Sequence, residues 1–170
     1  IMAKSTFSGP VKSLAGFISA GVNNSVSLTA DTTLTVDAHA GKILLCNDAD
    51  GKFTLPSISS TVPSDPTDPN QANNIGASFY FYIETAATDL DILTDGTDKF
   101  KGAVLVAVDD GAKKAFVPAA SNDVMTMNGS TKGGVVGSVV QVTAIDTATY
   151  LVHDSLLIGS GTIVTPFADA

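Results

Sequence analysis

Short runs of apolar and β-branched residues, each followed by a turn rich in Gly, Asp or Asn, recur along most of the chain. The clearest runs predict three consecutive strands, Thr32–Asp37, Lys42–Asn47 and Lys52–Pro56. In the third, polar and apolar residues alternate as Lys-Phe-Thr-Leu, the period-2 pattern of a half-buried strand. Because Asp50-Gly51 offers residues that tolerate positive φ, the last two strands are expected to form a hairpin.

The segment Gly76–Thr85 has the densest aromatic content and predicts a central strand that is packed on both faces. Gly102–Val108 and Lys113–Pro118 flank Asp109-Asp110-Gly111, which predicts a second hairpin. Further short strands are expected at Ser25–Thr29, Asp89–Thr94, Asp123–Met127, Val135–Ile145, Thr149–His153, Ser155–Ile158 and Ile163–Thr165.

About ten short strands with turn signals between them indicate an all-β fold, either a β-sandwich of jelly-roll type or a partly open barrel. A helical period of 3.6 residues is never sustained, so little helix is expected, and no fixed-period solenoid repeat is evident. We expect a single β-sandwich domain over residues 25–170 and an extended N-terminal arm over residues 1–24.

Two segments are expected to reach beyond the sandwich. The arm has sparse apolar residues around a Ser-Gly-Pro break, and it either contacts a neighbouring subunit or folds back on its own sandwich. The loop 57–74 has prolines at three-residue spacing, which exclude a helix or a central strand. The expected interface residues in these segments are Phe7, Pro10, Val11, Phe17, Pro63, Pro66 and Pro69.

Composition removes several classes of function. The chain has 170 residues and a net charge of −8, and all 9 of its basic residues are lysines, so it is poorly equipped to bind nucleic acid. Neither a membrane-spanning run nor the apolar core of a signal peptide is evident. Cys46, the single cysteine, is expected to be a small buried apolar residue, and a lone thiol fits synthesis in a reducing cytoplasm.

The residues that usually carry catalysis or bind cofactors are sparse. His39 and His153 lie far apart in the sequence, Glu84 is the single glutamate, and no nucleophile elbow or phosphate-binding loop is present. We therefore expect no catalytic residues and no cofactor. The remaining candidate is a calcium site formed by Asp89, Asp91, Asp95 and Asp98, with solvated turns as the alternative.

Several segments resemble structural proteins of tailed-phage virions, in particular those of marine and cyanobacterial phages. The central match is residues 32–56, whose Leu-Pro strand end precedes a loop and then the Gly-x-x-Phe-x-Phe strand of Gly76–Phe81. The other segments that carry the resemblance are Phe7–Phe17, Thr149–Val152, Gly159–Thr162 and Thr165–Phe167.

This resemblance implies a capsid decoration (cement) protein, a small β-sandwich that forms a homotrimer on the virion surface and binds the major capsid protein. Such proteins have no catalytic residues. The alternatives are a receptor- or glycan-binding domain of a head or tail fibre, an enzyme, and another β-protein such as a surface-layer or adhesin domain. The absence of Trp and the core-like position of the aromatic strand argue against glycan binding.

Overall fold

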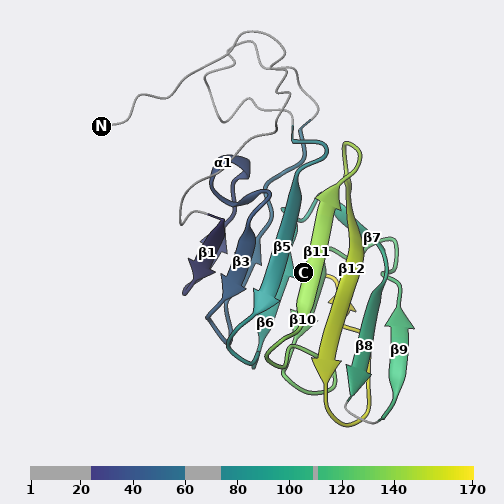
Figure 1. The fold of residues 1–170 in the computed structure, drawn as a ribbon. Coiled ribbons are helices and arrows are strands. Elements are labelled where there is room, and N and C mark those ends of the chain that lie inside the picture. The colour runs from purple at the N-terminus through teal and green to yellow at the C-terminus, as the bar shows by residue number, and fades with distance from the viewer. Residues whose placement is uncertain (1–23, 60–73, 109–110) are drawn as a thin grey trace, which may run out of the picture.

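The computed structural model describes residues 24–59, 74–108 and 111–170, and in them the chain forms an open two-sheet β-sandwich. Sheet A has the strand order β1-β3-β5-β11-β12-β8-β9, with β7 also paired to β12, and sheet B has the order β13-β10-β6-β4-β2. Figure 1 shows sheet A in front, with strands of sheet B behind it. The prediction of an all-β, sandwich-like fold with little helix is confirmed.

The strands of sheet A are β1 (Ser25–Leu28), β3 (Ile43–Cys46), β5 (Ser78–Ile83), β7 (Lys99–Gly102), β8 (Val104–Val108), β9 (Lys113–Phe116), β11 (Val139–Ala144) and β12 (Thr149–Gly159). Those of sheet B are β2 (Thr32–Thr33), β4 (Lys52–Thr54), β6 (Leu90–Leu93), β10 (Val124–Met127) and β13 (Phe167–Ala168). The short helix α1 (Val36–His39) follows β2, with Thr35 as its N-cap, so only the start of the strand expected over Thr32–Asp37 is a strand.

The first half of the chain winds back and forth between the two sheets. Strands β1, β3 and β5 lie parallel in sheet A, while β2, β4 and β6 lie parallel in sheet B. Each successive pair of strands thus forms one coil, with one strand in each sheet. The hairpin predicted over residues 42–56 is therefore wrong, because β3 and β4 belong to different sheets.

The stretch after β3 crosses to the other sheet because its hydrogen-bond partners lie in the next coil. The carbonyl of Ala49 accepts from the backbone N–H groups of Thr88 and Asp89, at 2.7 and 3.2 Å. Gly51 is not among the residues with positive φ. A Cβ at Gly51 would lie 2.8 Å from the Phe53 ring, so this glycine permits a close approach rather than a hairpin turn.

The second half of the chain is mainly antiparallel. Strand β11 pairs antiparallel with both β5 and β12, and the hairpin β8–β9 forms as predicted. Strands β7 and β8 both run parallel to β12 and are separated by a break after Gly102, which has φ +98°. The sequence did not predict β7 or β13, and residues 163–165 are not a strand.

Strand β12 is one continuous strand, whereas two separate pieces were expected. A β-bulge interrupts its pairing with β11, since Gln141 pairs with His153 but Val139 pairs with Leu156. Asp154 occupies the bulge with φ 46°, a left-handed conformation that Asp adopts more readily than most residues. The hydroxyl of Ser155 accepts from the backbone N–H of Gln141 at 3.0 Å and so maintains the contact across the bulge.

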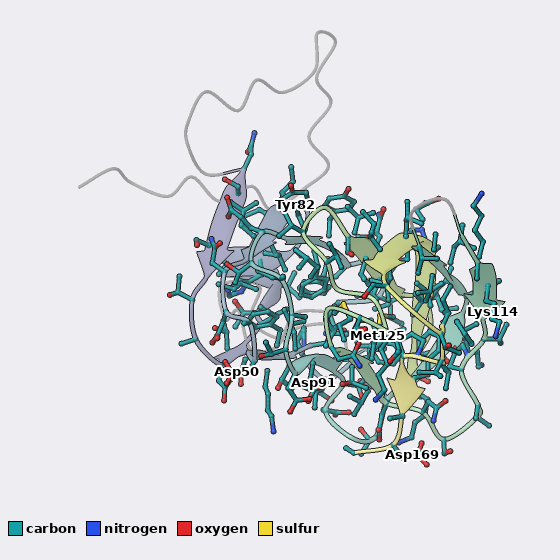
Figure 2. All side chains as sticks on the ribbon, turned by 90° about the horizontal axis from the view of Figure 1, so that it is seen from below. Asp50, Tyr82, Asp91, Lys114, Met125 and Asp169 are labelled. Carbon is teal, nitrogen blue, oxygen red and sulfur yellow. The ribbon has the colours of Figure 1, made fainter. Side chains whose placement is uncertain are left out.

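The core lies between the inner faces of the two sheets. The rings of Phe53 from sheet B and Phe81 from sheet A stack with their centroids 6.4 Å apart, and both side chains are fully buried. Cys46 is also fully buried, as expected, and burial raises the pKa of its thiol to about 12. Met125 lies in the interior between Tyr82 and Asp91, which Figure 2 shows on opposite sides of the sandwich.

Candidate interaction surface

The side of sheet A that faces away from the core is the most distinctive surface of the described chain. In β5 the burial alternates, so that Phe79 and Phe81 are fully buried while Tyr80 and Tyr82 are half-buried on the other side. Only one face of this strand is therefore core, in contrast to the predicted packing on both faces. On the four central strands, the outward positions are Ile43, Leu45, Ser78, Tyr80, Tyr82, Val139, Gln141, Thr143, Leu151, His153, Leu156 and Ile158. We call these residues the outer face of sheet A.

Apolar residues form a continuous row across this outer face. Register places Leu45 beside Tyr82, Tyr82 beside Val139, Val139 beside Leu156 and Leu156 beside Leu105 of β8. Leu156 and Leu105 are 39% and 41% exposed, which is high for leucines on a sheet. None of the outward positions of the four central strands is Lys, Asp or Glu. The one acid within these strands is Asp154, at the bulge of β12.

Three polar side chains of the outer face bond to one another. Ser78 Oγ lies 2.6 Å from Thr143 Oγ1, which lies 2.8 Å from His153 Nε2. On the other side of the ring, His153 Nδ1 lies 2.9 Å from the Asp154 carboxylate. His153 is thus hydrogen-bonded through both of its ring nitrogens.

The order hydroxyl, imidazole, carboxylate also occurs in nucleophilic triads. Such a site requires N–H donors that stabilise an oxyanion beside the nucleophile. Thr143 lies on β11, which is paired on both sides by β5 and β12. The backbone groups next to Thr143 therefore bond within the sheet.

The four acids of the calcium hypothesis do not converge. Asp89 and Asp91 lie at the start of β6, while Asp95 and Asp98 lie in the turn after it. Asp95 lies six residues after Asp89, and six residues of extended chain span roughly 20 Å. Across residues 24–59, 74–108 and 111–170, no three His, Cys, Asp or Glu side chains gather where they could hold a metal ion.

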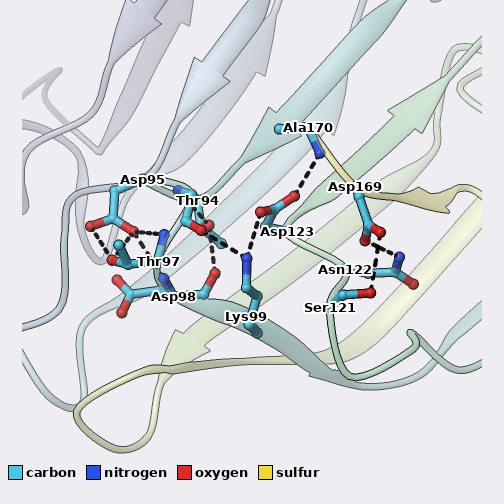
Figure 3. A network of polar contacts seen from close by, with 11 residues as sticks. Thr94, Asp95, Thr97, Asp98, Lys99, Ser121, Asn122, Asp123, Asp169 and Ala170 are labelled. Carbon is cyan, nitrogen blue, oxygen red and sulfur yellow. Dashed lines mark hydrogen bonds and ion pairs between the residues drawn. The ribbon is translucent and has the colours of Figure 1, made fainter.

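The acids near this turn act as hydrogen-bond acceptors within the fold (Figure 3). Asp95 Oδ1 accepts from the backbone N–H groups of Thr97 and Asp98, both at 2.9 Å. Burial opposes the ionised form of Asp95, but bonds from Asp98, Ser57 and Thr97 outweigh it and lower its pKa to about 2. Asp123 accepts from Lys99 Nζ at 2.6 Å and from the Ala170 backbone N–H at 2.9 Å.

All seven residues expected at an interface, from Phe7 to Pro69, lie outside the described residues. The base of the loop that contains the prolines is described. Asn74 is buried, its side-chain amide donates to Ser57 O at 2.7 Å, and its Oδ1 accepts from Ser59 N at 2.6 Å. These bonds fasten the two ends of the loop to each other.

Sequence reasoning did not find the outer face of sheet A. The signal was the alternation Phe-Tyr-Phe-Tyr over residues 79–82, in which every second ring carries a hydroxyl. A phenol favours a position that is apolar at one end and wet at the other, so the tyrosines mark the outward side. Both ring types count as aromatic, and the strand was therefore interpreted as core on both sides.

Comparisons with known proteins do not relate this chain to a family. No protein-family model matches the chain. Likewise, no curated protein and no solved structure matches it. Among the described residues, no helix is long and apolar enough to span a membrane.

Proposed function

We propose that this chain is a non-enzymatic structural protein of a tailed-phage virion, a decoration protein that binds the outer shell and stabilises contacts between major capsid subunits. The observation that carries the structural role is the apolar outer face of sheet A, which has no charged residue at the outward positions of its central strands. Depletion of charge together with tyrosine enrichment is typical of the core of a protein–protein interface. The proposal that the partner is a capsid rests on the resemblance of residues 32–56 and 76–81 to virion proteins.

The copy number of the chain in purified virions tests this proposal. A decoration protein covers the shell and should approach the abundance of the major capsid protein, whereas a fibre protein should amount to a small fraction of it. Quantitative mass spectrometry of gradient-purified particles measures the ratio. Absence of the chain from such particles would overturn the virion proposal.

The N-terminal arm is proposed as the anchor to the shell. Deletion of residues 2–20 should leave a folded domain, because the first strand begins at Ser25 and the core lies beyond it. The truncated protein should no longer co-sediment with undecorated capsids, and circular dichroism should show an unchanged β-spectrum. If it still decorates capsids at full occupancy, the arm is not the anchor.

A receptor- or glycan-binding fibre domain is the second candidate, because Tyr80 and Tyr82 face outward and could stack on sugar rings. The argument that the aromatic strand is entirely core no longer opposes this option. Screening the full chain against glycans, with Tyr80→Ala as the matched variant, tests it. Binding that Tyr80→Ala abolishes, together with a low copy number per particle, would favour the fibre role.

A further inference from the structure

The flanks of sheet A carry opposite charges. On the β1–β3 side, Glu84 follows β5 as an exposed side chain and accepts from Asn47 Nδ2 at 2.7 Å, and Asp48 and Asp50 lie in the adjoining connection. On the β9 side, Lys113 faces outward, because it pairs with Ala107, two residues from the outward Leu105. Figure 2 shows Asp50 and Lys114 at opposite ends of the molecule.

These charges lie at the same level along the strands. The apolar row runs from Leu45 through Tyr82 and Leu105 to Ala115 of β9. Glu84 is two residues past Tyr82, and Lys113 is two residues before Ala115 on β9, which runs antiparallel to β8 and β12. Both charged side chains therefore lie one step beyond the apolar row, at the same end of the sheet.

We propose that the outer face of sheet A is where copies of this chain meet, around a rotation axis parallel to the strands. Such an axis in front of the sheet brings the β9 flank of one copy against the β1–β3 flank of the next, whatever the number of copies. The apolar rows then face one another, and Lys113 of one copy lies toward the acidic side of the next, where Glu84 follows the third strand of the path and Asp48 lies just after the second. This inference rests on the proposed structural role, but it does not depend on the capsid as partner.

The whole outward side of sheet A, the outer face together with the flanking strands, is large enough for a stable contact. The path of sheet A contains seven strands. At about 4.8 Å between strands and about 3.3 Å per residue, a face six residues tall covers roughly 600 Å². Two such faces bury roughly 1,200 Å², the lower end of the range for specific interfaces.

The chemistry of the face favours a second copy over a sugar or a charged partner. Ser78, Thr143 and His153 already bond to one another, so burial under an apolar surface leaves them satisfied. The groups that remain to bond a sugar are the Gln141 amide and the hydroxyls of Tyr80 and Tyr82, which are outnumbered by the apolar side chains of the same face. Asp154 is the one charge among the central strands, so a strongly charged partner would find little complement there, while a second copy supplies the opposite sign at each flank.

Val139→Lys tests this contact, because Val139 is half-buried at the centre of the apolar row. Thr54→Lys is the matched control, since Thr54 is half-buried on β4 at the outer side of sheet B. Light scattering after size exclusion at micromolar concentration should show an oligomer for the wild type and for Thr54→Lys. Val139→Lys should weaken association on the order of tenfold or more, because it introduces a buried charge.

A charge exchange tests the arrangement of the flanks. Lys113→Glu and Glu84→Lys should each weaken association, and the double variant should recover it, with thermal melts confirming that every variant is folded. A wild-type monomer would overturn the inference, and so would an oligomer that Val139→Lys leaves intact. If the wild type is a monomer and Val139→Lys instead lowers capsid binding, the face docks the shell and not a second copy. The copy number in virions is measured separately, so failure of self-association leaves the virion proposal distinguishable.

Discussion

The two sheets present similar residues to the shared core and very different residues to the outside. Inward, Phe53 and Ile92 of sheet B meet Phe81 and Val142 of sheet A, all fully buried. Outward, sheet B presents Lys52 and Asp91 among threonines and Leu93 on adjacent strands. The outward positions on the central strands of sheet A carry tyrosine, leucine, isoleucine and valine beside four uncharged polar or histidine side chains, and none of them is a lysine or an acid.

Under the proposal that sheet A is a contact surface, this difference separates the residues needed for folding from those needed for association. Both inner faces are explained by the need of a sandwich to bury apolar area. The outer face of sheet B is an ordinary solvated surface. The outer face of sheet A exposes leucines that contribute little to the monomer, which is expected when a contact outside the monomer selects them.

The largest expected effect on stability compares the inner and outer sides of sheet A at two adjacent residues of β5. Phe79→Ala removes a fully buried ring of β5 and should lower the free energy of unfolding by about 3–5 kcal/mol. Tyr80→Ala, on the other side of the same strand, should change the stability of the monomer by about 1 kcal/mol or less. Urea unfolding at low protein concentration measures both. Equal losses would mean that the outer face is already part of the monomer core, and the comparison would break.

An intermediate effect is expected from Asp95→Asn, in the turn that leads from sheet B to sheet A. The folded pKa of Asp95 is about 2, below the unfolded value of about 3.9. Between these values the unfolded state binds more protons, so the stability that Asp95 provides is present above about pH 4 and is lost as the pH falls toward 2. The difference in unfolding free energy between wild type and Asp95→Asn should shrink over that window. A difference that stays constant would contradict the structural role of Asp95.

The smallest effect, and one of opposite sign, is expected for Asp91→Asn on the outer side of sheet B. Burial, joined by the charge of Asp89, raises the folded pKa of Asp91, against the hydrogen bond from Thr126 and the charges of Lys52 and Lys132. Because the folded state keeps the Asp91 carboxyl protonated to a higher pH than the unfolded state does, it loses relative stability as the pH rises above about 4. The unfolding free energy of the wild type minus that of the Asp91→Asn variant should therefore decrease with rising pH. An increase would show that the carboxylate is stabilised there.

Much of the strand content could be predicted from the sequence, while the path of the chain could not. Alternation and turn residues mark where β3 and β4 begin and end. Whether a turn returns a strand beside its predecessor or across to the other sheet is decided by distant partners, here the N–H groups of Thr88 and Asp89 on Ala49 O. Asp50-Gly51 has the local chemistry of a hairpin, and no local feature of the sequence reports those partners.

The same limit applies to the candidate surface. Which side of β5 is outward depends on the register with β3 and β11, and the bulge at Asp154 has no glycine to mark it. The aromatic run could be predicted as a strand, but its division into a core side and a contact side required the second sheet.

The burial of Cys46 gives the molecule an internal reporter. The thiol lies on β3 between β1 and β5, with a pKa of about 12, and it is the single cysteine of the chain. An alkylating reagent reacts with the thiolate, so labelling requires these coils to open first. The rate at which Cys46 is labelled therefore measures how fast the first half of the chain, which winds between the two sheets, opens. The unfolding of the antiparallel second half can be followed by other probes. The order in which the two halves come apart can thus be measured without introducing any mutation.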